Sequence, residues 1–233
     1  MSLEALIFDV DGTLAETEEA HRAAFNDTFK AWDLGWHWSQ DDYRRLLKTT
    51  GGKERIRAFQ AEQPDLEGRL SDERIAKFHA EKTKAYTDIL ARGGLELRPG
   101  VAGLIKTAKE AGLRVAVATT TNAPNVEALC QCCWGKPAED VFEVIAAGDQ
   151  VEAKKPAPDV FELALARLGL VPEKALAFED SRNGVLSAKA AGLRVVVTPS
   201  AYTDCDDFSA ADWVVASLQS GDLPDVLSGA LRG

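Results

Sequence analysis

The sequence lacks three things that would each place it in a particular class of protein. Four cysteines in 233 residues are too few and too unevenly spaced for a disulfide scaffold. Three of them cluster at Cys130, Cys132 and Cys133 without a second ligand pair at zinc spacing, so we interpret them as buried or inert thiols. Positive charge is scarce as well: the formal net charge of -10 argues against nucleic acid and anionic membrane as partners.

Long apolar runs are the third absence. No run approaches the ~18 residues that a membrane span needs. The amino terminus enters a predicted strand at once, without a basic region followed by an apolar stretch. We therefore expect a cytoplasmic protein, or one of the plastid stroma if a transit peptide has been removed. The length allows one large domain, or a core with a smaller one.

Strands and helices alternate along most of the chain. A first strand is predicted over 4–8, and a purely helical block follows, with helices over 18–31, 41–48, 53–63 and 72–90. Beyond it, helices over 101–111, up to 133, 158–168 and 181–191 alternate with strands over 113–118, 141–146, 175–178, 193–197 and 213–216. This alternation predicts an α/β fold, a Rossmann-like parallel sheet with helices on both faces.

The helical block lies between the first strand and the rest, so we interpret it as an insertion. We predict an α/β core over 1–15 and 94–233, and a helical cap over 16–93 that selects the substrate. The cap is expected to cover the carboxyl edge of the sheet.

Two acids stand directly after the first apolar run. Asp9 and Asp11 follow Leu6-Ile7-Phe8, and alternation along a strand points both side chains the same way. Enzymes of the α/β class place their chemistry at this end of a strand. Gly12 allows a sharp turn and close approach to the backbone. A solvated turn is the alternative, because Asp and Gly are common turn residues.

Three further motifs end later strands. Thr119 to Asn122 opens a helix, where hydroxyl and backbone N–H groups suit a phosphate oxygen or, alternatively, cap the helix. Lys155 precedes a rigid proline segment and offers a fixed charge for a phosphate, although alone it would be a solvated lysine. Glu179 and Asp180 add two acids to the same edge. Clustered carboxylates repel one another unless a cation is present, and an all-oxygen ligand set points to Mg²⁺.

With these four motifs in order, the chain resembles the haloacid dehalogenase superfamily of phosphotransferases over essentially its whole length. The inserted helices are similar to that family's cap of the first type. The resemblance implies a phosphoric monoester hydrolase in which Asp9 attacks phosphorus and forms an aspartyl-phosphate. It implies that Asp11 first protonates the leaving group and then activates water. Dehalogenating members lack this second acid, so Asp11 argues against dehalogenation.

The same resemblance assigns the remaining groups of the site. Thr119 and Lys155 are expected to hold the transferring phosphoryl oxygens. The expected Mg²⁺ ligands are Asp9, the backbone carbonyl of Asp11, Glu179 and Asp180.

The substrate has to be predicted from the inserted helices. Gly51 and Gly52 precede a helix that begins with Lys53 and Arg55, and free N–H groups with these charges predict a second anion site, which Lys82 could join. Exposed charges on helix faces are the alternative. A second anion site implies a substrate phosphorylated at both ends.

Residues 11–21, 43, 51–55, 118–122 and 126–130 resemble the CbbY-type branch of the family. This implies a phosphatase of xylulose 1,5-bisphosphate, an inhibitory sugar made by misfiring of Rubisco in the Calvin cycle. The substrate-binding residues expected from it are Thr13, Glu18, His21, Tyr43, Gly51, Gly52, Lys53, Lys82, Thr120, Asn122 and Asn183.

Several alternatives remain open at this stage. A phosphomutase of the β-phosphoglucomutase kind shares the core, the cap and a His at the His21 position. A phosphoglycolate phosphatase and a catalytically silent binding protein on this fold are the others. In each enzymatic case the partner is a small phosphorylated substrate, and we expect a monomer or weak dimer.

Overall fold

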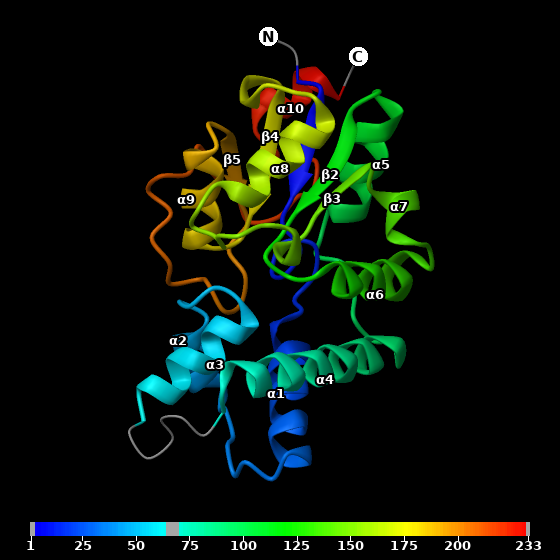
Figure 1. The fold of residues 1–233 in the computed structure, drawn as a ribbon. Coiled ribbons are helices and arrows are strands. Elements are labelled where there is room, and N and C mark those ends of the chain that lie inside the picture. Colours follow the sequence, from blue (N-terminus) through cyan, green and yellow to red (C-terminus); the bar gives the residue numbers. More distant parts are fainter. Residues whose placement is uncertain (1–2, 64–69, 232–233) are drawn as a thin grey trace. The chain divides into compact units, whose positions relative to one another are not determined.

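The computed structural model describes residues 3–63 and 70–231 (Figure 1). The chain divides into two units. We call the first the core unit, which comprises Met1–Glu16 and Leu95–Gly233, and the second the helical unit, which comprises Thr17–Gly94. No helix in the described part of the chain is long and apolar enough to cross a membrane.

The core unit is built on a six-stranded sheet in the order β3-β2-β1-β4-β5-β6. All neighbouring strands are parallel. The predicted α/β class with a Rossmann-like parallel sheet is therefore confirmed. The strands are β1 (Ala5–Phe8), β2 (Arg114–Ala118), β3 (Val144–Ala146), β4 (Ala175–Glu179), β5 (Arg194–Val197) and β6 (Trp213–Val214).

Both faces of the central strands β1, β2 and β4 are buried, which is why these strands read as apolar runs and not as an alternation. Helices α8 (Asp159–Leu168) and α9 (Arg182–Ala190) pack against the face that carries Ile7. The rings of Phe8 and Phe178 stack with their centroids 4.5 Å apart. The other helices of this unit are α5 (Val101–Glu110), α6 (Ala123–Trp134), α7 (Ala138–Val141) and α10 (Asp225–Ala230), with short 3-10 turns over Gly148–Gln150 and Pro172–Lys174.

The largest differences from the sequence prediction concern two short helices, and the strand predicted over 213–216 is also shorter, at Trp213–Val214. The strand predicted over 141–146 begins only at Val144, because the residues before it form the helix α7. Pro137 stands at the start of that helix, and the carboxylate of Glu127 accepts a hydrogen bond from the N–H of Ala138 at 2.8 Å. The apolar residue Val141 therefore belongs to a helix of 4 residues, which is too short to show the helical repeat of apolar residues in the sequence. Helix α10 was not predicted, and it is similarly short.

The helical unit contains α1 (Glu18–Ala31), α2 (Gln40–Leu46), α3 (Gly52–Ala61) and α4 (Asp72–Ala91). Helices α1 and α4 make the main contact, and α3 also packs against α4. Aromatic rings fill the space between these helices, with Phe25 against Trp38 at 4.6 Å and Phe29 against Phe78 at 5.1 Å between centroids. This packing gives the unit a core of its own, since Phe25, Phe29, Trp38 and Phe78 are fully buried.

The strand order reverses direction at β1, since β2 and β3 lie on one side of it and β4, β5 and β6 on the other. In open α/β sheets such a switch point is where ligands bind, beyond the carboxyl ends of the strands. The register aligns Phe8 with Val117 and with Phe178. The segments that follow β1, β2 and β4 therefore emerge side by side at the switch point.

Candidate active site

Side chains predicted from the sequence meet at this carboxyl edge. Asp9 follows β1, Thr119 follows β2, and Glu179 and Asp180 lie at the end of β4. The N–H of Asp9 donates to the carbonyl of Phe178 at 2.9 Å, which continues the strand pairing into the site. All four side chains are buried.

Lys155 ties two of these acids together. Its Nζ donates to Asp9 Oδ1 at 2.7 Å, to Glu179 Oε1 at 2.6 Å and to the carbonyl of Ala118 at 2.9 Å. An ammonium group has three protons, so all of them are used inside the protein. Lys155 is 5% exposed, and the ring of Phe161 lies 5.0 Å from its Nζ. The alternative of a solvated surface lysine is therefore wrong.

Burial and mutual repulsion shape the charge of this cluster. Burial raises the pKa of Asp9, the attraction of Lys155 opposes this, and the nearby charge of Asp11 adds to it. Burial likewise raises the pKa of Glu179 to about 8, with Lys155 opposing and Asp9 adding to the rise. For Lys155 burial lowers the pKa, but the charges of Asp9 and Glu179 outweigh burial and raise it above its ordinary value. One buried cation thus lies beside more carboxyl groups than it could neutralise if all of them were ionised.

The arrangement fits a divalent cation. One carboxylate oxygen from each of Asp9, Glu179 and Asp180 lies within 4.8 Å of the others. In the described part of the chain, Glu179 Oε2 is buried and has no hydrogen-bond partner. A site made only of oxygen ligands suits a hard cation such as Mg²⁺. The carboxylate of Asp11 is not part of this cluster, and the prediction for Asp11 concerned its backbone carbonyl.

Two glycines leave room for these acids. A Cβ on Gly12 would overlap Asp180 Oδ2, and a Cβ on Gly184 would overlap the carboxylate of Glu179. Gly12 also has a φ of +77°, a conformation that side chains other than glycine rarely adopt. Gly12 therefore serves both the turn after β1 and the direct contact with Asp180.

The residues predicted around the phosphoryl group belong to the core unit, and three of them lie within residues 119–122. Thr119 Oγ1 accepts a hydrogen bond from the N–H of Thr121 at 3.2 Å. The side chain of Asn122 accepts a hydrogen bond from the N–H of Asn125 at 3.1 Å and so caps α6. This agrees with the alternative that the polar residues after β2 cap the helix. Thr120 and Asn183 are half-buried in the same unit, and Thr13 is fully buried.

The helical unit brings several of its predicted residues into pairs. Tyr43 donates its hydroxyl to Glu18 at 2.9 Å and accepts from Arg55 at 3.0 Å. Lys82 Nζ lies 2.7 Å from His21 Nδ1, and both side chains are buried. Because an ammonium can only donate, Nδ1 of His21 is the acceptor in this pair. Lys53 is exposed, which agrees with the alternative that it is an exposed charge on a helix face.

His79 was not predicted as a site residue, yet it lies among the predicted substrate-binding residues of the helical unit. A Cβ on Gly52 would overlap its imidazole. Burial, with smaller contributions from the charges of Lys82 and Lys53 and from the neighbours His21 and Arg55, lowers the pKa of His79 to about 3. The signal was available in the sequence, because His79 lies three residues before Lys82 and therefore on the same face of α4.

Two of the three clustered cysteines, Cys130 and Cys133, show no reactive character. Cys130 is buried, and burial raises its pKa and that of Cys133 to about 12. Thiols held in the protonated form are poor nucleophiles and poor metal ligands. For these two residues the interpretation as inert thiols agrees with the structure.

The chain has close relatives among known proteins. Residues 3–192 match the family model of haloacid dehalogenase-like hydrolases. Protein CbbY of Rhodobacter capsulatus is 60% identical over 94% of this chain and 96% of its own length. The crystal structure of CbbY from Rhodobacter sphaeroides in complex with phosphate superimposes with a TM-score of 0.89 at 53% identity, covering 94% of this chain and 96% of that one. A mutant of that protein, crystallised with xylulose 1,5-bisphosphate, has the same TM-score at 52% identity and the same coverage.

The half-buried His79, whose lowered pKa keeps it neutral, makes the helical unit sensitive to acid. Between its ordinary pKa of 6.5 and its folded pKa of about 3, the unfolded chain binds a proton that the folded chain does not. Stability should therefore fall as the pH drops through this window. From pH 7 to pH 5 we expect His79 to account for a loss of about 1–2 kcal/mol in the free energy of unfolding.

The measurement is urea unfolding at both pH values for the wild type, His79→Gln and His37→Gln. His37 lies in the same unit but is exposed, and it serves as the matched control. His79→Gln should lose much of the acid sensitivity, and His37→Gln should keep it. Equal acid sensitivity in all three proteins would contradict the assignment.

Proposed function

The chain belongs to the haloacid dehalogenase-like hydrolase family, and on that premise we propose that it is a Mg²⁺-dependent phosphatase that uses Asp9 as its nucleophile. The observation that carries this proposal is the ion cluster at the switch point. There Lys155 Nζ lies 2.7 Å from Asp9 Oδ1, beside the acids Glu179 and Asp180. A carboxylate held by one oxygen keeps the other free to attack.

In the first step Asp9 attacks phosphorus in line with the leaving oxygen. The new bond joins a carboxylate oxygen to phosphorus, and the bond between phosphorus and the alcohol oxygen breaks, which leaves an aspartyl-phosphate on Asp9. Asp11 donates its proton to the departing alkoxide. Proton transfer of this kind contributes typically ~10²–10⁴-fold to the rate.

In the second step a water molecule attacks the aspartyl-phosphate. Asp11, now a carboxylate, takes a proton from this water, and the phosphorus–oxygen bond to Asp9 breaks to release inorganic phosphate. The side chain of Asp11 is half-buried, so it reaches water without being fully solvated. One acid therefore serves both steps.

Asp9, Glu179 and Asp180 would hold the Mg²⁺, together with the backbone carbonyl of Asp11. The ion supplies neutralisation of the charge that builds up between carboxylate and phosphate. Thr119 and Lys155 hold the phosphoryl oxygens in this account. Since Lys155 already donates all three protons within the protein, a contact with phosphate replaces one of them.

The substrate we propose is xylulose 1,5-bisphosphate, so that the enzyme removes an inhibitor of Rubisco. Support comes from the mutant relative that was crystallised with this sugar and is 52% identical to this chain. In the helical unit, Lys82 lies beside His21, and the imidazole of His79 lies close to Gly52. A second phosphate of the substrate would be attracted by the positive charge of Lys82.

Replacing the nucleophile tests the mechanism. Asp9→Asn should lower the turnover of p-nitrophenyl phosphate with Mg²⁺ by at least ~10³-fold, because an amide cannot form the acyl-phosphate. The circular dichroism spectrum should stay that of the wild type. Asp225→Asn, on an exposed position of α10, is the control and should turn over normally. Near wild-type hydrolysis by Asp9→Asn would refute the assignment of the nucleophile.

A substrate panel with a charge variant tests the choice of sugar. We expect the highest kcat/KM for xylulose 1,5-bisphosphate, with release of inorganic phosphate. Lys82→Met should raise KM for the bisphosphate about 10-fold or more, since a charge-assisted hydrogen bond is worth about 1.5–3 kcal/mol. Lys84→Met, exposed on the same helix, should leave KM unchanged.

Three other outcomes would contradict the proposal, each in a different way. A clear preference for phosphoglycolate would leave the mechanism intact but replace the sugar bisphosphate. Conversion of β-glucose 1-phosphate into glucose 6-phosphate would identify a phosphomutase. Absence of any hydrolysis across the panel and over a range of Mg²⁺ concentrations would identify a silent binding protein.

A further inference from the structure

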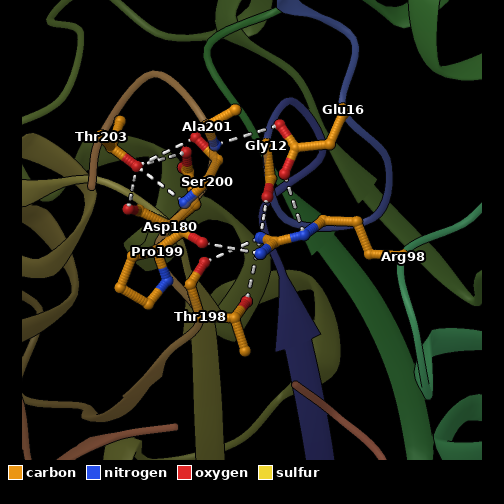
Figure 2. Close-up of polar contacts among 9 residues, drawn as sticks. All are labelled: Gly12, Glu16, Arg98, Asp180, Thr198, Pro199, Ser200, Ala201 and Thr203. Carbon is orange, nitrogen blue, oxygen red and sulfur yellow. Dashed lines mark hydrogen bonds and ion pairs between the residues drawn. The ribbon is translucent and has the colours of Figure 1, made fainter. Parts of the chain in front are cut away.

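Arg98 connects three segments of the core unit that are far apart in the sequence (Figure 2). Its Nη1 donates to the carbonyl of Gly12 and, at 2.7 Å, to the carbonyl of Thr198. Its Nη2 donates to the carbonyl of Pro199 at 2.7 Å, and its Nε lies 3.2 Å from the carboxylate of Glu16. The side chain is only 13% exposed. A guanidinium with this many backbone partners sets the spacing of the segments that it contacts.

The first group of contacts that Arg98 makes is with the segment after β1. Gly12 and Glu16 both lie there, and Ala15 pairs with Leu97 in an isolated antiparallel bridge. The N–H of Arg98 itself donates to the carbonyl of Leu14 at 2.8 Å. Arg98 therefore holds the acidic loop by both its backbone and its side chain.

The second group of contacts, with the carbonyls of Thr198 and Pro199, connects Arg98 to Asp180. Ser200 follows the two carbonyls that Arg98 binds, and its N–H donates to Thr203 Oγ1 at 2.9 Å. Thr203 Oγ1 in turn donates to the carbonyl of Asp180 at 2.7 Å and lies 3.2 Å from its Oδ2 (Figure 2). This same Oδ2 is the atom that packs against Gly12, where a Cβ would overlap it.

The contacts therefore close a ring. It passes from Arg98 to Gly12, from Gly12 to the Asp180 carboxylate, and back to Arg98 through Thr203 and Ser200. None of the atoms in this ring reacts in the proposed mechanism. They determine instead where the carboxylate of Asp180 lies relative to the loop that carries Asp9 and Asp11.

We propose that Arg98 is a positioning residue that places the Asp180 carboxylate for the divalent cation. This rests on the proposed function, because it is that function which needs the cation. Partners that orient a ligand typically change metal affinity or activity by 10–100-fold when they are removed. The loss should therefore appear as weaker Mg²⁺ binding and not as weaker binding of the phosphate ester.

The test compares Arg98→Lys, Arg98→Met and Arg114→Met. Lysine keeps the charge and can still pair with Glu16, but it lacks the planar fork that reaches three carbonyls. Arg114 is the matched control, because it also pairs with a carboxylate, that of Glu143 at 2.6 Å, and donates to a carbonyl, that of Leu168. It begins β2 and so lies at the opposite edge of the sheet from the site.

Mg²⁺ binding is measured by isothermal titration calorimetry without substrate. The KM for p-nitrophenyl phosphate is measured at saturating Mg²⁺, and the free energy of unfolding by urea. We expect both Arg98 variants to bind Mg²⁺ at least ~10-fold more weakly with KM within about 2-fold of the wild type. Arg114→Met should lose stability but keep its Mg²⁺ affinity.

Thr203→Val tests the contacts between Ser200 and Asp180, because valine keeps the shape of the half-buried side chain but removes the hydroxyl that joins them. Its free energy of unfolding is measured as well, since the lost hydroxyl leaves the N–H of Ser200 without this acceptor. We expect weaker Mg²⁺ binding, and we expect the double variant Arg98→Lys/Thr203→Val to bind about as weakly as the weaker single variant. Effects that multiply would show that the two residues act independently and would overturn the proposal.

The outcomes separate the two levels of the account. A wild-type protein that binds no Mg²⁺ would refute the proposed function itself. A wild type that binds Mg²⁺ while Arg98→Lys and Thr203→Val bind it equally well would refute only the role of Arg98.

Discussion

The structure depends on one interaction, the contact of the Lys155 ammonium with two buried carboxylates. Lys155 is 5% exposed, and Asp9 and Glu179 lie within 2.7 Å and 2.6 Å of its Nζ. Removing such charges from water is costly, and the cost is offset only if they are paired and hydrogen-bonded. The pairing is incomplete, because Asp180 adds a further buried acid to the same cluster. These three buried acids could together hold a metal ion, and this is the physical basis on which we propose a divalent cation at this edge.

The fold makes this concentration of charge possible. Strands β1, β2 and β4 are adjacent and parallel, so the residues after them emerge at one edge. Gly12 removes the side chain that would keep Asp180 away, and Arg98 fixes the loops on either side. Each of these features serves the placement of acids that repel one another. Rigid elements with supporting contacts are what a preorganised site requires.

Much of the core unit could be predicted from the sequence. Buried parallel strands read as short apolar runs, and polar residues that follow such runs must meet at the carboxyl edge, which is how Asp9, Thr119 and Asp180 were found. The structure brings these three residues to that edge, and the match with the haloacid dehalogenase-like family confirms the predicted family. The roles of the individual residues stay predictions, and so does the assignment of the helical unit as the part that selects the substrate.

Other features could not be predicted, because local patterns do not carry them. Arg98 looks like any arginine before a Pro-Gly turn, and its partners at Gly12 and Thr198 are distant in the sequence. The short helix α7 gives no readable period, so Val141 was placed in a strand. His79 was within reach, since its spacing from Lys82 is helical.

The most direct test of the central claim is to locate the cation. Crystals grown with Mn²⁺ in place of Mg²⁺ give an anomalous signal that identifies the metal. The account predicts one strong peak at the carboxyl edge of the sheet, bonded to carboxylate oxygens of Asp9 and Asp180 at about 2.0–2.3 Å. The same peak should be absent from Asp180→Asn. A saturated crystal with no metal at Asp9 and Asp180, or with an unchanged peak in Asp180→Asn, would contradict the account.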